Sequence, residues 1–309
     1  MIDYFNFTNN DKNFQIFYGV GSGVWQTWQK PRGCTFVEIF TIGGGAGGSS
    51  GYTDVLGSGT RFGGGGGGSS AIVSGVFFAN FLPDTLYISV GMGGFGQTQS
   101  SIGTSGELSF VSTQPTSAAT ANLLLRSGTI PPTCSNTQAG GAASTVFTQG
   151  TALLSYLGVI TAVAGAAGAA GGNNASPANA VAAATNILTG GAGGGSVRSV
   201  GNVTLASGGL QGSGFIPTIA GGVSGSLGVD GQDGLSMPYY NFPSTQNMSE
   251  AMVFIGGLGG GASHLSNGGN GGNGSYGCGG GGGGGSTTGN GIGGRGGNGG
   301  DGLVIITCW

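Results

Sequence analysis

Residues that could do acid–base or nucleophilic chemistry are few in this chain. Its 309 residues include one histidine, His264 in "GGGASHLSNGG", so any Ser-His-Asp arrangement would have to use it. No G-x-S-x-G nucleophile elbow stands between a strand and a helix. Matches to G-x-G-x-x-G are inevitable at this glycine content and carry no weight without a βαβ unit. We therefore expect no enzyme and no cofactor, with His264 in a loop or at the edge of a glycine tract.

Metal-ligating residues are equally sparse. Asp230 and Asp233 in "VDGQDG" form the one close acidic pair outside the amino terminus, but they lack the ligand count of an EF-hand loop. Weak calcium binding is one interpretation, and a polar turn without a metal is the one we favour. The four cysteines are too far apart in sequence for a CxxC motif, and we expect buried thiols at Cys34, Cys134, Cys278 and Cys308.

One cysteine pair leaves a second interpretation open. Cys34 and Cys308 each lie beside an apolar, strand-like run and could face one another across a sheet. The amino terminus has no secretion signal, which argues against an oxidising compartment. A disulfide between these two residues is therefore an alternative rather than the expectation.

Glycine dominates the composition, with 77 residues. Ordering a glycine costs about 0.5 to 1 kcal/mol more than ordering an alanine, so these residues oppose folding unless something dense holds them. Disordered chains usually combine low hydrophobicity with high net charge. Here only 6% of residues are charged, the net charge is -3 and the mean hydropathy is positive. We expect an ordered protein whose backbone is packed.

The charge distribution argues against two classes of partner. Lysine and arginine total seven and are scattered, so no basic stripe is available for nucleic acid. The best candidate for a membrane span, residues 153–170, is only weakly apolar and lacks flanking positive charges. We expect neither nucleic acid nor a membrane as a partner.

Several segments have the pattern of β-strands. Runs begin at Thr35, Ala71 and Thr85, and the last of these alternates apolar and polar residues. "LGVITAVAG" from Leu157 and the terminal "LVIITCW" from Leu303 are continuously apolar, which predicts strands covered on both faces. "LPDT" at 82–85 predicts a tight reversal between two strands. Helical periodicity is confined to residues 178–188, so the pattern predicts an all-β core.

Glycine tracts separate these strands, at residues 43–48, 63–68, 190–195, 256–261, 268–274 and 279–285. In the Gly-Gly-X triplets near the carboxyl terminus, Arg295, Asn298 and Asp301 recur every third residue. Three residues is the repeat of a polyproline II-type helix, which rises about 3.1 Å per residue and points its backbone polar groups outward. Such helices can pair these groups with one another if no side chain separates them, which only glycine permits.

We therefore predict a polyglycine II bundle attached to a small β-sandwich or jelly-roll-like core. The all-glycine tracts are expected inside the bundle. The Gly-Gly-X stretches are expected on its surface, with Arg295, Asn298 and Asp301 along one exposed edge. The alternative interpretation of any single tract is a flexible linker.

The order of these motifs resembles a known family. "VWQTWQKPRGCTFVEIFTIGGGAGG", with Trp28, Pro31 and Gly33, is similar to the start of the glycine-rich domain of tailed-phage and other viral structural proteins. "GGGGGGSSAIVSGVFFANFLPDTLYISVGMGGFG" and "GGNGGDGLVIITCW" resemble its next and terminal units. The resemblance covers residues 20–309, and residues 108–144 and 235–253 look like insertions without a counterpart.

The resemblance implies a structural protein on the virion surface, such as a tail-fibre tip, adhesin or head fibre that contributes to host attachment. Its implied partners are other virion subunits and a host surface glycan or protein receptor, and it implies a homo-oligomer, with a trimer as one form. A secreted glycine-rich surface adhesin or ice-binding protein is the alternative. That class would be expected to carry a signal peptide and a flat threonine-rich face, and neither is evident.

Two segments are candidates for contact with partners. Tyr239, Tyr240 and Phe242 stand between two prolines, where a stiff aromatic loop could bind a receptor or simply pack over the bundle. Residues 1–23 form a second segment, distinct from the domain at 24–309. Its aromatic residues predict docking on another virion subunit, through Phe5, Phe7, Phe14 and Phe17.

Overall fold

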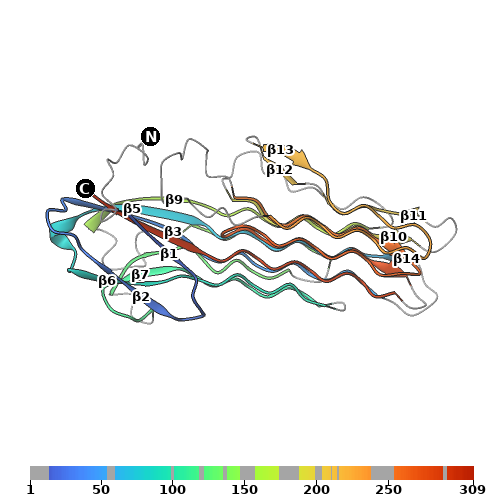
Figure 1. The fold of residues 1–309 in the computed structure, drawn as a ribbon, viewed down its shortest axis with the longest axis horizontal. Helices are drawn as coiled ribbons and strands as arrows, with labels where there is room; N and C mark the ends of the chain where they lie inside the picture. Colours follow the sequence, from blue (N-terminus) through green and yellow to red (C-terminus); the bar gives the residue numbers. More distant parts are fainter. Residues whose placement is uncertain are drawn as a thin grey trace.

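The protein is elongated, with a β-sandwich at one end and glycine-rich segments running along the rest of its length, as the computed structural model shows (Figure 1). Both the carboxyl terminus and the first described strand lie at the sandwich end. The structure describes residues 14–53, 60–98, 101–117, 122–134, 138–146, 157–173, 188–198, 204–209, 211–213, 216–237, 254–287 and 291–309.

The larger sheet of the sandwich has five antiparallel strands in the order β1-β16-β3-β5-β9. The strands are β1 (Phe14–Tyr18), β16 (Leu303–Cys308), β3 (Phe36–Ile42), β5 (Ile72–Phe78) and β9 (Gly158–Val163). The terminal strand therefore lies between β1 and β3. Its six residues are all buried, as the continuous apolar run predicted.

The smaller sheet has four antiparallel strands in the order β2-β6-β7-β8. The strands are β2 (Trp25–Gln29), β6 (Thr85–Ser89), β7 (Phe110–Ser112) and β8 (Leu123–Arg126). Strands β7 and β8 come from residues 108–144, the first of the expected insertions. That segment thus completes the second sheet of the sandwich.

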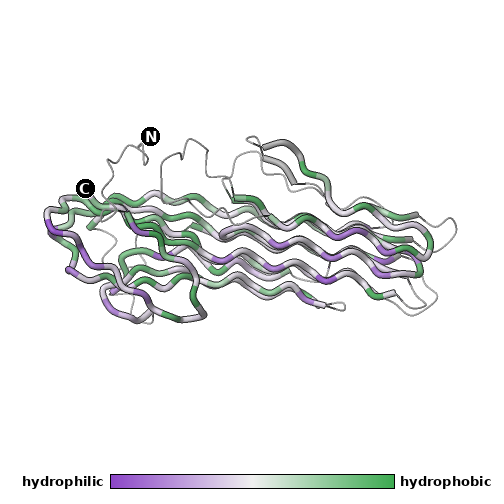
Figure 2. The backbone as a smooth tube through the Cα atoms, in the orientation of Figure 1, coloured by the Kyte–Doolittle hydropathy of each residue, from purple (hydrophilic) through white to green (hydrophobic). Residues whose placement is uncertain are grey.

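The two sheets enclose one hydrophobic core. Val37, Ile39 and Phe77 of the larger sheet and Leu86 and Ile88 of the smaller sheet are fully buried in the same cluster. Trp28 belongs to it and is 3% exposed. Figure 2 shows the hydrophobic residues concentrated at this end of the molecule. The alternation of residues in β3 and β6 thus places one face of each strand in a common interior.

One expectation about the sandwich is wrong. Strand β9 lies at the edge of its sheet and Val159 is 74% exposed, so its apolar run does not reflect cover on both faces. The "LPDT" segment lies between two strands, as expected. It follows the short 3-10 helix η1 (Ala79–Phe81) and connects β5 to β6, which belong to different sheets.

Short strand pairs lie away from the sandwich. The parallel pair β14 (Ser263–His264) and β15 (Ser286–Thr287) sits toward the far end of the bundle (Figure 1). The antiparallel pairs involve β4 (Thr60–Arg61), β10 (Val197–Arg198), β11 (Thr204–Leu205), β12 (Gln211–Ser213) and β13 (Ile216–Ile219).

The glycine tracts form the polyglycine II bundle that the sequence predicted. Residues 279–285 are its centre, because six other segments surround them. Their amides donate to carbonyls of three neighbours, and three further neighbours donate to their carbonyls. Along the tract the acceptor rotates with a period of three: Gly279, Gly282 and Gly285 all donate to segment 189–195. The accepting segments are 189–195, 46–49 and 269–272, and the donating segments are 64–67, 257–260 and 294–297.

The close spacing of these segments explains the glycine content. A Cβ on Gly191 would stand 1.9 Å from the carbonyl oxygen of Gly280. The residues of tracts 63–68 and 279–285 are all buried, as expected for the bundle interior. The flexible-linker alternative does not apply to these tracts.

Two expectations fall partly or wholly outside the described residues. The short helix expected at 178–188 lies outside them except for Leu188, which pairs with Phe254 in an isolated β-bridge. Part of the membrane candidate at 153–170 forms strand β9. Among the residues that the structure describes, no helix has the length and apolar character needed to cross a membrane.

Candidate functional site

Three glycine-rich segments lie side by side on one face of the bundle and run in parallel: 230–237, 267–274 and 291–300. The amide of Gly231 donates to the carbonyl of Asn267. Three residues further along both segments, the amide of Gly234 donates to the carbonyl of Asn270. The middle segment makes the same pattern with the third, because Gly268 donates to Ile292. A common direction and a common period of three bring every third residue of each segment into register.

The residues at these third positions face outward, whereas most of the glycines between them are buried and Gly231 and Gly271 are half-buried. Asn267, Asn270 and Asn273 are exposed, and so is Arg295. The expectation of an exposed edge is confirmed for Arg295 and only partly for Asn298 and Asp301, which are half-buried. The reason is that segment 91–98 lies against them: Gly96 and Gly93 donate to their side chains at 2.9 and 2.8 Å.

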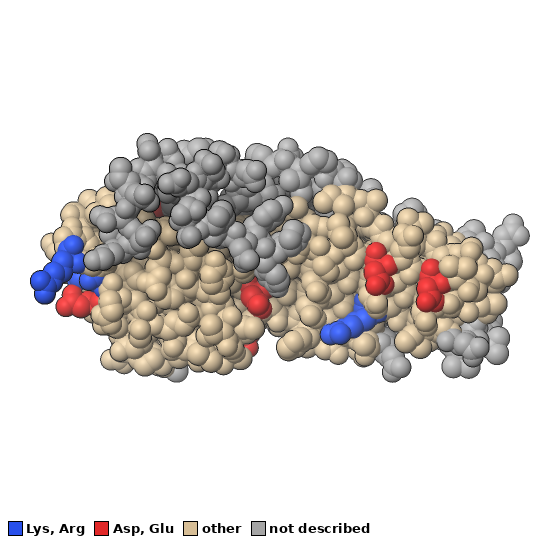
Figure 3. Space-filling model, in the orientation of Figure 1, with Lys and Arg blue, Asp and Glu red and all other residues tan. Residues whose placement is uncertain are grey.

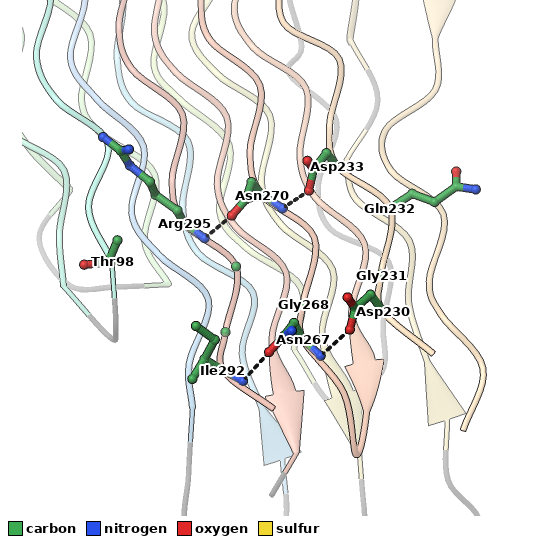
Figure 4. A pocket seen from close by; sticks show the side chains of 12 residues that line it. Thr98, Asp230, Gly231, Gln232, Asp233, Asn267, Gly268, Asn270, Ile292 and Arg295 are labelled. Atoms are coloured by element: carbon green, nitrogen blue, oxygen red, sulfur yellow. Dashed lines mark hydrogen bonds between the residues drawn. The ribbon is translucent and has the colours of Figure 1, made fainter. Parts of the chain in front are cut away.

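Side-chain oxygens connect neighbouring segments into transverse rows. In one row the amide of Asn270 donates to Asp233 Oδ1 at 2.6 Å, and the amide of Arg295 donates to Asn270 Oδ1 at 2.8 Å. Arg295 Nε then donates to the Gly96 carbonyl at 3.3 Å. Figure 4 shows this row and the parallel row that starts at Asp230. Each third-position side chain of segments 230–237 and 267–274 therefore supplies the acceptor for an amide of the next segment.

The other rows repeat this arrangement at steps of three residues, or about 9 Å along the helix axis. The amides of Asn267 and Asn273 donate to Asp230 Oδ1 and Ser236 Oγ, and those of Ile292 and Asn298 donate to Asn267 Oδ1 and Asn273 Oδ1. At the surface of a bundle these amides would otherwise need water as acceptor. We call this set of bonds the side-chain ladder.

Beside this ladder lies a groove of about 680 Å³. We call it the bundle groove; its lining is Thr98, Asp230, Gly231, Gln232, Asp233, Asn267, Gly268, Asn270, Ile292, Gly293, Gly294 and Arg295. The lining combines two carboxylates, one guanidinium and primary amides with the apolar side chain of Ile292, which is 50% exposed and lies at one side of it (Figure 4). Such a mixture can bind a polar ligand through hydrogen bonds. Figure 3 shows few charged side chains elsewhere on the drawn face of the bundle.

Hydrogen bonds lower the pKa of one carboxyl group in the groove. The Ser266 hydroxyl and then the Asn267 amide donate to Asp230 Oδ1 and lower the pKa of that carboxyl below its usual range. Asp230 is therefore an acceptor at neutral pH. With Asp233 also acidic and Arg295 basic, the lining carries one net negative charge, which disfavours an anionic ligand.

Two tight turns near the groove expose apolar side chains. Leu227 is 67% exposed, Val229 is 53% exposed and Leu265 is 46% exposed. The turns are bonded together, because Gly228 donates to the carbonyl of His264 at 2.8 Å. Leu265 has a φ of 62°, which is uncommon for a residue with a side chain. This pair of turns could not be predicted, because each apolar residue is isolated in the sequence among glycines and polar residues.

His264 lies at the edge of a glycine segment, as expected, in strand β14. Its Nδ1 lies 2.5 Å from Thr287 Oγ1, so its ring is engaged with a neighbouring strand. Among the described residues, no group of three or more His, Cys, Asp or Glu residues could hold a metal ion.

None of the four cysteines forms a disulfide; Cys134, Cys278 and Cys308 are buried as expected, whereas Cys34 is half-buried. Burial raises the pKa of Cys278 to about 12. Burial and then the neighbouring Cys34 thiol raise the pKa of Cys308 to about 12. Cys34 and Cys308 thus lie next to each other, as the sequence allowed, and no disulfide joins them.

The predicted contact residues divide into two groups. Tyr239, Tyr240, Phe242, Phe5 and Phe7 lie outside the described residues. Phe14 and Phe17 belong to β1, the outer strand of the larger sheet. Phe14 is 38% exposed, whereas Phe17 is 3% exposed and packs in the sandwich core.

Another aromatic cluster lies at the sandwich end and was not predicted. Phe36 packs against Phe78 and Trp309, with ring centroids 5.0 and 5.9 Å apart, and Phe78 contacts Phe81. Phe78 and Phe81 are 52% and 61% exposed. Their sequence context, "VFFANF", indicated a strand and gave no means of telling which aromatic residues remain outside the core.

Residues 20–309 match the family model described as a glycine-rich domain. The chain belongs to the glycine-rich domain family. The match extends over the bundle and over every strand of the sandwich except β1, which precedes residue 20. No curated protein matches the chain.

Proposed function

We propose that this glycine-rich domain protein is a non-catalytic structural subunit displayed on the surface of a virus particle, where it contributes to host attachment. The observation that carries the proposal is the arrangement of the bundle. A central helix with six hydrogen-bonded neighbours forms a straight, dense rod that starts at the sandwich and carries the bundle groove on its side.

The composition of this rod suits an extracellular particle. Its described segments are joined by many backbone hydrogen bonds, and such bonds are insensitive to salt and to pH near neutrality. Outside a cell, an appendage of a virus particle is exposed to changes in salt concentration and in pH. A rod joined by backbone hydrogen bonds suits these conditions.

The sandwich end is proposed to dock on other virion subunits. Phe78 and Phe81 expose aromatic surface there, at the end of the molecule that also holds Phe14 and the carboxyl terminus. Exposed aromatic side chains are enriched at the centres of protein interfaces. We also propose that the protein is a homo-oligomer, with a trimer as one form; its mass in solution by light scattering tests this directly.

The bundle groove is proposed to bind a host surface glycan, with a protein receptor as the other outcome. Carboxylates, amides and a guanidinium around an apolar side chain match the alternating hydroxyl and C–H surfaces of a sugar. The net negative charge of the lining favours a neutral glycan. The apolar turns at Leu227 and Leu265 would extend the same contact surface.

Two measurements test these proposals. Antibodies against the purified protein should label the surface of intact particles in electron microscopy, and labelling only of disrupted particles would contradict the proposal. On a glycan array, Arg295→Ala should lose binding that Arg32→Ala retains, because Arg32 is also exposed but lies at the sandwich end. If host cells bind the protein and the array does not, the ligand is a protein receptor.

A further inference from the structure

Four asparagines in the described part of the bundle are each followed by glycine: Asn267, Asn270, Asn273 and Asn298. An Asn–Gly pair is chemically labile, because glycine has no side chain to shield its amide nitrogen. That nitrogen can attack the side-chain carbonyl carbon of the preceding asparagine. A chain with several such pairs in its outer face would therefore lose amide groups steadily if the pairs were free to react.

The net reaction consumes one water molecule and releases one ammonia molecule, and hydroxide in the solvent can serve as the base. A base removes the proton from the glycine amide, and the nitrogen attacks Cγ of the asparagine. The bond from Cγ to Nδ2 breaks, ammonia leaves and a succinimide ring forms. Water then opens either of the two ring bonds to nitrogen, which gives aspartate or isoaspartate. No oxidant or reductant takes part.

The bundle restrains the attacking nitrogen at all four pairs. Each glycine amide donates to a carbonyl on a neighbouring segment, at distances between 2.8 and 2.9 Å. The acceptors are Ile292, Arg295, Asn298 and Gly94 for Gly268, Gly271, Gly274 and Gly299 respectively. Removing the proton first requires that this bond opens, the same step that limits amide hydrogen exchange.

The side-chain ladder restrains the group that would be attacked. Each of the four asparagines accepts a hydrogen bond at Oδ1 from the amide of the next segment, at 2.8 to 3.1 Å. The donors are the amides of Ile292, Arg295, Asn298 and Gly96. The side-chain carbonyl is therefore held toward a neighbouring segment. Both reacting groups are engaged elsewhere in the folded protein.

We propose that these four Asn–Gly pairs are a modification site gated by the fold: they remain asparagine while the bundle is closed and deamidate when it opens. This inference is independent of the proposed function. The consequence of the modification follows from the packing. Aspartate at position 267 would set a second carboxylate beside Asp230, whose Oδ1 already accepts the amide of that residue.

Isoaspartate would disturb the bundle more strongly. It adds a methylene group to the main chain and shifts the following glycines along the axis. Those glycines have no free space, since a Cβ on Gly269 would stand 2.0 Å from the carbonyl oxygen of Gln232. A chain modified in the open state would thus be unable to close again in register.

Peptide mapping by mass spectrometry tests the gating. The full-length protein is incubated at mildly alkaline pH either folded or in guanidinium, and deamidation is followed separately at each of the four sites. We expect deamidation in the folded protein to be slower by roughly tenfold or more, in line with the protection that closed hydrogen bonds give. Equal rates in the folded and the unfolded protein would overturn the proposal.

A variant pair tests the contribution of the ladder at one site. Arg295→Pro removes the amide that holds Asn270 Oδ1, and proline suits the dihedral angles of this helix type. Arg295→Ala keeps the amide and serves as the matched control. Deamidation at Asn270 should be faster in Arg295→Pro, with Asn273 unchanged. Equal rates at Asn270 in two folded variants would overturn the role of the side-chain hydrogen bond.

Discussion

A methyl group on Gly282 would stand 1.9 Å from the carbonyl oxygen of Gly64, far inside van der Waals contact. The two segments are also bonded directly, because the amide of Gly64 donates to the carbonyl of Gly283 at 2.7 Å. The close approach of the two segments and the hydrogen bond between them therefore have the same cause. The backbone groups can pair only because the side chains are missing.

Gly282→Ala is expected to destabilise the protein by about 3 kcal/mol or more, at the upper end of overpacking costs, because neighbouring backbone cannot yield as a flexible side chain would. Chemical denaturation monitored by circular dichroism measures the change. The control is Gln232→Ala, an exposed substitution that should change stability by less than about 0.5 kcal/mol. Similar stabilities for the two variants would refute the close packing of the central tract.

Asn298→Ala should lower the free energy of unfolding by about 1 kcal/mol, the usual net contribution of one hydrogen bond. Its Oδ1 accepts the amide of Gly96 at 2.9 Å, and alanine has no acceptor to replace it. Asn298→Asp keeps an oxygen in that position and should lose less. If both variants unfold at the same urea concentration as the parent protein, the ladder does not stabilise the bundle.

Alkaline pH should destabilise the protein through its buried thiols. Burial raises the pKa of Cys278 from 9.0 to about 12, so the folded state favours the neutral thiol. The resulting stabilisation is fully present below pH 9 and is lost as the pH rises from about 9 to 12. Thermal unfolding across this interval should show a smaller decline in Cys278→Ser, which cannot ionise there. An identical decline in both proteins would exclude this thiol as the cause.

The Asp230 carboxylate should become protonated only at a pH below the usual pKa of 3.8. Its pKa is lowered in the folded state, so its contribution is present above the usual value of 3.8 and disappears as the pH falls through the lowered pKa. Titration followed by NMR of the Asp230 side chain measures this value. In Ser266→Ala, which removes the strongest cause, the pKa should move back up. A pKa at or above 3.8 in the parent protein would contradict the hydrogen-bonding account of the groove.

Periodicity made much of the fold predictable. The alternation in Thr85–Ser89 and the apolar run at Leu303–Cys308 identified two strands, and the three-residue repeat at Arg295 and Asn298 identified the helix type. These are local patterns in which residue type follows directly from exposure. Such patterns indicate the same element whichever segment of the chain lies beside it.

The lateral order of the segments could not be predicted in the same way. Every glycine tract presents the same backbone, so nothing in residues 279–285 specifies that segment 64–67 is a neighbour and segment 230–237 is not. The groove depends on that order, because it requires Asp233, Asn270 and Arg295 from three distant segments to lie in one row. For the same reason, the apolar composition of β9 did not show that it lies at a sheet edge.

Amide hydrogen exchange of residues 279–285 measures the backbone pairing of the central helix most directly. If six neighbouring segments satisfy this tract, its amides should exchange as slowly as those of β16 in the sandwich core, through global unfolding. Exchange at the rate of an unstructured glycine peptide, while β16 stays protected, would contradict the bundle.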